Sequence, residues 1–124
     1  RKAQTLRWHD ERGGLPDDWI RCLAMHDGHC YAGTFVGGLA RRDGDRWTTV
    51  PGLPPGEITA LASYGGALLI GTRAGLYTLR TGAARRLHSP ILPAEIQALC
   101  PAEDGVWVGT RTGLCFLTKA AVAP

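Results

Sequence analysis

Residues 68–79, LLIGTRAGLYTL, are followed by nearly the same line at residues 106–117, VWVGTRTGLCFL. Both segments begin with an apolar triplet, pass through Gly-Thr and a short loop, and resume with Gly-Leu and another apolar run. A looser copy surrounds residues 33–34, so Gly-Thr pairs at 33, 71 and 109 recur every 38 residues. An internal repeat of this length predicts the architecture of the whole chain.

Each repeat predicts a set of short strands. The first strand of each unit alternates short and larger side chains, and these strands are predicted at Ile20–Ala24, Ile58–Ala62 and Ile96–Cys100. Tight turns are predicted after them at Asp27-Gly28, Gly65-Gly66 and Asp104-Gly105. The apolar triplet before Gly-Thr is typical of a strand buried on both faces, and Gly-Leu opens a third strand. Fourth strands are predicted at Arg46–Val50 and near Arg86, Leu87 and His88.

Four short strands in about 40 residues are the pattern of a β-propeller blade. Because one blade has two apolar faces, blades pack face to face around an axis, and the strands nearest the axis need small side chains. The aligned positions of the three first strands are all small: Cys22, Ala60 and Ala98, then Ala24, Ala62 and Cys100. The predicted fold class is therefore all-β, with about three four-stranded antiparallel propeller blades.

The predicted organisation is a single propeller segment over residues 1–124. Blades are predicted at residues 14–51, 52–90 and 91–124, and the last of them has only three strands. Residues 1–13 hold a strand near residues 3–9, the fourth strand of an incomplete blade, which would complete the last blade. Since propellers use about four to eight blades, the chain is predicted to be part of a longer propeller or to assemble with copies of itself into a six- to eight-bladed ring.

The best-formed repeat, residues 92–114, resembles the two-component regulator propeller repeat. The shared features are Leu-Pro, then isoleucine, leucine, Asp-Gly, Val-Trp-Val-Gly-Thr and Gly-Leu. Residues 53–76 match this motif well. Residues 15–39 match it loosely, with Tyr31-Ala32 in place of Trp-Val and an extra glycine in Gly37-Gly38. The resemblance implies bacterial propeller blades of the kind found in sensory regions of hybrid histidine kinases, some of which sense glycan fragments. Such proteins are often periplasmic, and the shared motif is structural, so it carries no catalytic residue.

Composition excludes several classes of function. Of 124 residues, 44% are hydrophobic and 20% are charged, and no apolar stretch is long enough to predict membrane insertion. The formal charge is +3, with arginines single or paired rather than in one dense patch, so nucleic acid is not an expected partner. The first ten residues have no apolar run of the kind found in a secretory signal, and the sequence does not indicate a compartment.

No metal, cofactor or catalytic residue is predicted. The cysteines lack Cys-x-x-Cys spacing and are interpreted as small apolar fillers, with a disulfide left open: Cys22, Cys30, Cys100 and Cys115. His26 and His29 flank a predicted turn and are interpreted as solvated side chains rather than metal ligands. The sequence also has no Gly-x-Ser-x-Gly elbow and no phosphate-binding loop before a helix.

The candidate site is predicted from propeller geometry. Loops that join blades and loops between second and third strands gather on one face, around the channel mouth. The predicted ligand-binding residues all lie in these loops: Asp17, Asp18, Trp19, Phe35, Glu57, Arg73, Glu95 and Arg111. The residues at 19, 57 and 95 align between repeats, as do those at 35, 73 and 111. Aromatic rings with carboxylates and guanidinium groups suit a polar ligand such as a glycan, or an acidic peptide; the alternative is ordinary solvated residues paired between blades.

The predicted function is thus a non-catalytic module that binds a ligand or a protein on its loop face, in a sensory setting if the resemblance holds. One alternative is a propeller-type lyase or hydrolase in which Glu57, Glu95 and His88 act as acid or base. A second alternative is a purely structural ring that assembles from copies of the chain. Self-association, or the remaining blades of a longer chain, is the expected partnership.

Overall fold

The computed structural model describes residues 6–92 and 94–124, and these residues form three antiparallel sheets with almost no helix. Blade 1 contains β1 (Ile20–His26), β2 (His29–Thr34), β3 (Leu39–Asp43) and β4 (Arg46–Thr49). Blade 2 contains β5 (Ile58–Tyr64), β6 (Ala67–Thr72), β7 (Gly75–Leu79) and β8 (Ala84–Arg86). Blade 3 contains β9 (Ala98–Ala102), β10 (Gly105–Thr110) and β11 (Gly113–Thr118). The helical turns are η1 (Glu11–Gly13) and α1 (Lys119–Val122), and no helix among the described residues is long and apolar enough to cross a membrane.

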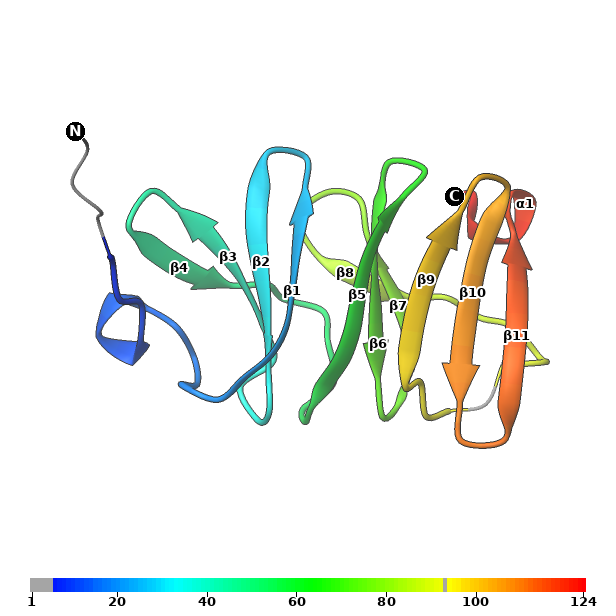
Figure 1. The fold of residues 1–124 in the computed structure, drawn as a ribbon, viewed down its shortest axis with the longest axis horizontal. Coiled ribbons are helices and arrows are strands. Elements are labelled where there is room, and N and C mark those ends of the chain that lie inside the picture. The colour runs from blue at the N-terminus through cyan, green and yellow to red at the C-terminus, as the bar shows by residue number, and fades with distance from the viewer. Residues whose placement is uncertain (1–5, 93) are drawn as a thin grey trace.

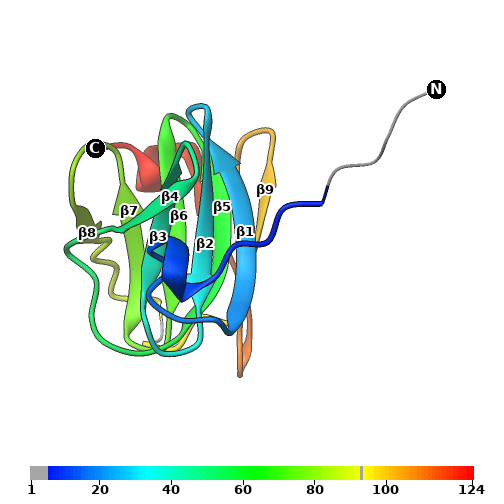
Figure 2. The same ribbon diagram turned by 90° about the vertical axis from the view of Figure 1, so that its left-hand side faces the viewer.

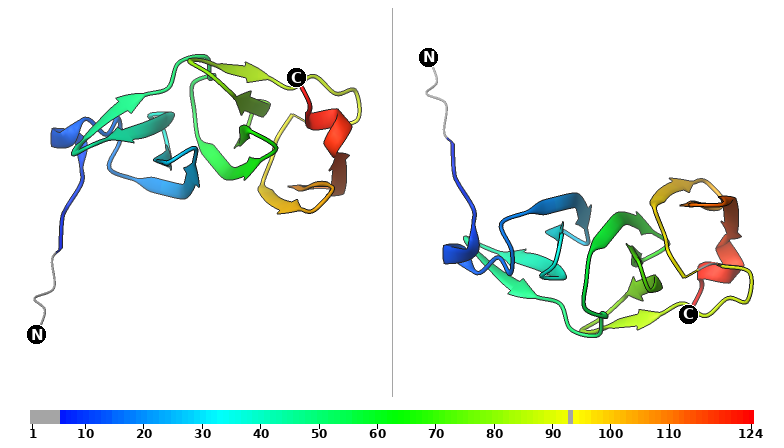
Figure 3. Two further views of the ribbon diagram at one scale, coloured as in Figure 1. Left: turned by 90° about the horizontal axis from the view of Figure 1, so that it is seen from above. Right: turned by 90° about the horizontal axis from the view of Figure 1, so that it is seen from below.

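The three sheets stand side by side like successive blades (Figure 1). In each sheet the strands follow the order of the chain from one edge to the other. The first strands β1, β5 and β9 lie along one side of the molecule, and β4 and β8 lie along the other (Figures 2 and 3). The all-β fold class with blade-like sheets of four, four and three strands is confirmed, and the described residues form a row of blades that does not close into a ring.

Most of the core lies between neighbouring blades. One cluster of buried side chains joins blade 1 to blade 2, including Tyr31 and Leu39 from the first and Ile58 and Ile70 from the second. A second cluster joins blade 2 to blade 3 in the same way. Every position of β6, the second strand of the middle blade, is buried, because a blade covers each of its two faces. The doubly buried second strand predicted from the apolar triplets is therefore present in blade 2.

The glycine and the threonine of each Gly-Thr pair have different structural roles. A Cβ atom on Gly33 would lie 2.6 Å from Cγ2 of Ile58, and one on Gly71 would lie 2.9 Å from Cγ2 of Ile96. The glycine therefore leaves room for an isoleucine of the following blade. The threonine hydroxyl donates to the carbonyl oxygen at the start of the third strand, at 2.7 Å from Thr72 to Gly75 and 2.9 Å from Thr110 to Gly113. This bond closes the loop that leads away from the second strand.

Two predicted turns form as expected, and the third is shifted. Asp27 and Gly28 both have positive φ, at 51° and 82°, as do Gly65 and Gly66, at 60° and 81°. These values suit tight two-residue hairpins. The turn predicted at Asp104-Gly105 lies one residue earlier, at Glu103-Asp104, because Gly105 is the first residue of β10. Glycine is needed there for close approach, since a Cβ atom would clash with the carbonyl oxygen of Leu117.

Other predicted boundaries shift by two residues. We call the interface between two neighbouring blades a joint. β9 begins at Ala98 rather than Ile96, because the N–H of Ile96 donates across the joint between blades 2 and 3 to the carbonyl oxygen of Thr72, at 3.0 Å. β8 ends at Arg86 rather than continuing to His88. Both changes lie in the segment that crosses from the outer edge of blade 2 to the inner edge of blade 3.

The N-terminal segment lies against blade 1. Residues 6–10 belong to no strand, whereas residues 3–5 of the predicted fourth strand lie outside the described residues. Arg7 pairs with Asp45 at 3.0 Å, and the ring of Trp47 donates a hydrogen bond to His9 at 3.1 Å. These two contacts hold the described part of the segment against β4 and the turn between β3 and β4.

Candidate functional site

The candidate residues lie at one end of the three blades, which we call the loop face. It consists of the segments that enter β1, β5 and β9 and the loops β2–β3, β6–β7 and β10–β11, all at the lower edge in Figure 1. All eight predicted residues fall in these segments: Asp17, Asp18, Trp19, Phe35, Glu57, Arg73, Glu95 and Arg111. The fold therefore brings segments from the whole chain to one face.

Two aligned positions meet in every blade. In blade 1 the rings of Trp19 and Phe35 stack, with centroids 4.3 Å apart and an angle of 21° between the planes. In blade 2 the same two positions hold an ion pair, with Nε of Arg73 2.9 Å from Oε1 of Glu57. The third blade repeats this pair more loosely, with 3.6 Å between Arg111 and Glu95. The same pair of positions thus carries an aromatic stack in blade 1 and ion pairs in blades 2 and 3.

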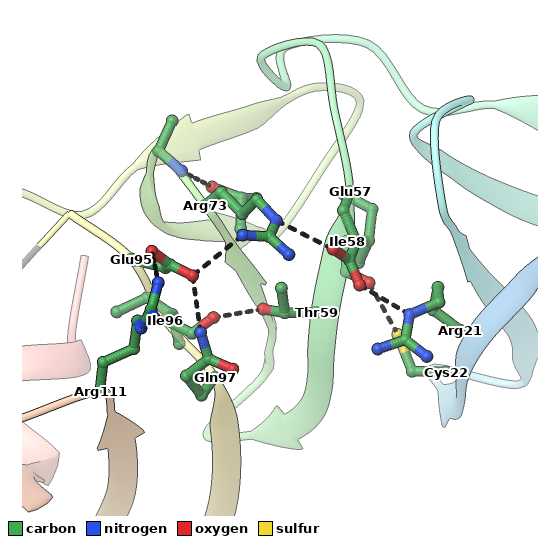
Figure 4. A network of polar contacts seen from close by, with 12 residues as sticks. Arg21, Cys22, Glu57, Ile58, Thr59, Arg73, Glu95, Ile96, Gln97 and Arg111 are labelled. Atoms are coloured by element: carbon green, nitrogen blue, oxygen red, sulfur yellow. Dashed lines mark hydrogen bonds and ion pairs between the residues drawn. The ribbon is translucent and has the colours of Figure 1, made fainter. Parts of the chain in front are cut away.

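A chain of polar contacts links the three blades (Figure 4). Arg21 of β1 donates from Nε to Oε2 of Glu57 at 2.6 Å, and thereby joins blade 1 to blade 2. Arg73 donates to Glu57 and also, at 3.1 Å, to Glu95 of the next blade. Gln97 adds a hydrogen bond to Glu95 at 2.7 Å. Both oxygens of Glu57 are used within the protein, whereas the three guanidinium groups at 21, 73 and 111 keep much of their surface exposed.

The charge state of Glu57 follows from these contacts. The hydrogen bond from Arg21 lowers the pKa of Glu57, the one from Arg73 acts in the same direction, and burial of the carboxyl group opposes both. The group is therefore an ionised carboxylate at neutral pH. General acid–base catalysis works best with a pKa near the operating pH, so this arrangement suits a structural or binding carboxylate.

Replacing Glu57 by glutamine is expected to lower the free energy of unfolding at pH 7 by about 1 kcal/mol, because two charge-assisted hydrogen bonds with partly exposed partners are weakened. A folded-state pKa below the unfolded value stabilises the protein above the unfolded pKa, about 4.3 for glutamate. The wild-type advantage over the variant should therefore be constant above about pH 5 and disappear on further acidification through the folded pKa. Urea unfolding at a series of pH values measures this difference; an advantage that persists unchanged to about pH 2 would contradict the assigned ion pairs.

Asp17 and Asp18 shape the loop face rather than present free carboxylates. Asp17 accepts hydrogen bonds from the backbone N–H groups of Trp19, at 3.0 Å, and Val36, at 2.9 Å. These contacts, the one from Trp19 first, lower the pKa of Asp17. Asp18 accepts from the N–H of Glu11 at 2.8 Å. Asp17 thus connects the segment that carries Trp19 to the β2–β3 loop that carries Phe35, and holds the two rings in register.

Other side chains with possible chemistry are accounted for by packing. His26 is buried and its Nδ1 lies 2.6 Å from Oγ of Ser63 in blade 2, so the prediction that it is a solvated turn residue was wrong. The four cysteines are free, and burial raises the pKa of Cys22 to about 11. His88 follows β8 at the outer edge of blade 2, whereas Glu57 precedes β5 at the inner edge of the same sheet. Among residues 6–92 and 94–124, no group of three or more His, Cys, Asp or Glu side chains has the arrangement of a metal site.

Arg21 and Gln97 take part in these contacts but were not among the predicted site residues. They align with each other and with Thr59 at the second position of the inner-strand region, where Thr59 donates to the carbonyl oxygen of Ile96 at 2.6 Å. The sequence did contain a signal for them, because the aligned positions 21, 59 and 97 are all polar. Comparison with known proteins adds no family: no family model matches the chain, and no curated protein matches it. The resemblance to two-component regulator propeller repeats stays a prediction from the sequence.

Proposed function

We propose that this chain is a non-catalytic binding module that recognises an acidic saccharide on its loop face. The observation that carries the proposal is the stacked pair of Trp19 and Phe35, in which 59% of the Trp19 surface is exposed. An exposed, rigid aromatic surface next to hydrogen-bonding groups is the arrangement that receives the apolar C–H face of a pyranose ring.

The charges along the loop face favour an acidic sugar over a neutral one. Arg21, Arg73 and Arg111 expose between 44% and 70% of their side chains along the row of blades. Glu57 and Glu95 pair with these arginines, yet much of each arginine side chain stays exposed. Guanidinium groups bind carboxylates through paired hydrogen bonds, and the chain has a formal charge of +3. The loop face therefore offers one apolar surface and several cationic donors.

The same contacts support binding rather than catalysis. An acid or base in a lyase or hydrolase needs a pKa matched to its task and access to the substrate. Glu57 is nearly buried, its pKa is lowered, and both its oxygens accept hydrogen bonds from arginine. Because the sequence resembles propeller repeats of sensory proteins, we also propose that the bound saccharide acts as a signal.

Replacing Trp19 by alanine is expected to weaken saccharide binding about tenfold, because an aromatic stacking contact contributes about 1 kcal/mol or more. The probes are β-1,4-linked glucuronate oligomers and the matching glucose oligomers, titrated by isothermal calorimetry. Wild-type protein should bind the glucuronate series more tightly, and added salt should reduce that preference.

The matched control is Trp8→Ala, since Trp8 is also exposed but lies beside the outer edge of blade 1. This variant should bind like the wild type. Equal affinities for Trp19→Ala and Trp8→Ala, or no binding of either oligomer by the wild type at millimolar concentration, would refute the proposed function. Turnover of the glucuronate oligomers that Glu57→Gln abolishes would support the lyase or hydrolase instead.

A further inference from the structure

The two joints between blades follow one rule. At the first joint, Ile58 and Leu61 of blade 2 pack towards Cys22 and Ala24 of blade 1, and Ile58 lies over Gly33. The following blade therefore contributes large side chains from its inner strand, and the preceding blade contributes a glycine and small side chains. This is close packing of projections into hollows, as in protein interiors.

The second joint repeats the rule with different residues. Ile96 and Leu99 of blade 3 belong to the same buried cluster as Ala62 of blade 2, and Ile96 lies over Gly71. Both isoleucines, at 58 and 96, are fully buried. The two joints thus agree in position, residue size and orientation.

Each end of the row of blades exposes one of the two kinds of surface that meet in an internal joint. At one end, Ile20 and Leu23 align with the isoleucine and leucine of the later blades, yet they are 37% and 64% exposed. With Met25, also exposed, they form what we call the N-terminal face. At the other end, the three atoms nearest to a Cβ atom added at Gly109 all belong to Ala98 of its own blade, the closest at 3.3 Å, whereas Gly33 and Gly71 each meet an isoleucine of the following blade. The hollow is present and, among the described residues, nothing fills it.

The end of blade 3 also exposes large apolar side chains. Trp107 and Leu114 align with Leu69 and Leu76, which are fully or almost fully buried in the second joint. In blade 3 these two positions are 46% and 74% exposed. We call this surface the C-terminal face: Ala98, Cys100, Trp107, Gly109 and Leu114.

We propose that the C-terminal face binds the N-terminal face of a second copy of this chain, so that two copies close a head-to-tail ring. The joint would place Ile20 of one copy over Gly109 of the other, and Leu23 against Ala98 and Cys100, by the rule of the two internal joints. Pairing two C-terminal faces would bring no isoleucine to the hollow at Gly109, because the isoleucine that fills it belongs to an N-terminal face, and an unfilled hollow costs stability. Two copies of three blades make six, within the range of about four to eight that propellers use.

In the proposed joint between two copies, the contacts are made mainly by the inner strands. On blade 1 the outer part of the N-terminal end is covered by Leu15 and Trp47, which pack over Ala32 and Ala40. In the internal joints the inner strands β1, β5 and β9 lie side by side (Figures 1 and 3). The exposed apolar side chains of β1 are therefore those that a neighbouring blade would contact first.

Ring formation would also extend the polar chain of the loop face. Arg73 reaches across the second joint to Glu95 of the following blade. Arg111 is the aligned arginine of blade 3, and the aligned partner position on the next blade is Trp19 of the second copy. A guanidinium group over an indole ring is a favourable cation–π contact. The assembly would thus set the aromatic pair of one copy beside the exposed arginine of the other.

The test measures mass in solution by size-exclusion chromatography with light scattering, in reducing buffer because Cys100 is exposed. The wild type is expected at twice the 13.3 kDa of one chain. Leu23→Glu and Cys100→Glu each disable one face and should be monomeric with unchanged far-ultraviolet circular dichroism. The control Ile91→Glu, at an exposed residue outside both faces, should remain a dimer.

Mixing the two variants separates head-to-tail joining from other contacts. Leu23→Glu retains its C-terminal face and Cys100→Glu retains its N-terminal face, so an equimolar mixture should form a heterodimer through one intact joint. A wild type of 13.3 kDa at all concentrations would overturn the proposal. So would a dimer of Leu23→Glu alone, a mixture that stays monomeric, or a wild-type mass that grows beyond two copies.

Discussion

Replacing Ile58 by alanine is expected to lower the free energy of unfolding by about 4 kcal/mol, the upper part of the range for a fully buried isoleucine. Ile58 is completely buried and fills the hollow over Gly33, so its truncation removes contacts from both sides of the first joint. The blades cannot close this space independently, because β1 and β5 are each fixed in their own sheets. Urea unfolding followed by circular dichroism measures the loss.

Ile91→Ala is the matched control, since this isoleucine is exposed in the segment between β8 and β9. Its effect should stay within about 0.5 kcal/mol of zero. Both variants are compared with wild type at one protein concentration, because association would add to apparent stability. Equal losses for the two variants would contradict packing of blade 2 on blade 1 through Ile58.

Gly52→Ala is expected to lower the free energy of unfolding by about 3 kcal/mol through strain and overpacking. Gly52 has a φ of 96°, and a Cβ atom there would clash with the carbonyl oxygen of Ala84 in β8. The same relation holds between Gly14 and Trp47 in blade 1, so the contact belongs to the repeat.

Gly56→Ala separates the two contributions to that loss. Gly56 has a φ of 118°, but a Cβ atom added to it would have no neighbouring atom within 4 Å. Alanine at this position therefore costs only backbone strain, about 1 kcal/mol. Chemical denaturation of both variants should show the Gly52 substitution to be the more harmful by about 2 kcal/mol. A larger loss for Gly56→Ala would contradict the packing of the interblade segment on β8.

Much of the fold could be predicted because the repeat encodes contacts that recur. Gly33, Gly71 and Gly109 take the same place at the end of the second strand, and spacing alone located them. The small residues of the inner strands were likewise predictable, since they are fixed by approach of the next blade. Turns with two left-handed residues, such as Gly65-Gly66, have a strong local signal.

The remaining errors arise where contacts between blades override local pattern. The start of β9 depends on a hydrogen bond from Ile96 to Thr72, which no local propensity reveals. Gly105 resembles a turn glycine but is required by the close approach of Leu117. His26 carries a side chain typical of solvent, yet Ser63 of the neighbouring blade supplies its partner.

In the candidate site, too, the positions of the residues could be predicted from the sequence but their contacts could not. Alignment of the repeats predicted that the residues at 19, 57 and 95 share one position and those at 35, 73 and 111 another. It could not show that Trp19 stacks on Phe35, or that Arg73 bridges two glutamates, because side-chain directions depend on the neighbouring blade. Arg21 was missed because it lies within a strand rather than in a loop.

Nuclear Overhauser contacts across the two internal joints test most directly whether successive sheets pack face to face. With isoleucine methyl labelling, we expect strong contacts from the Cγ2 methyl of Ile58 to the α-protons of Gly33, and from the Cγ2 methyl of Ile96 to the α-protons of Gly71. Both should be seen, since the same rule forms both joints. Absence of both contacts in a folded sample with all three hairpins intact would contradict the stacked-blade architecture.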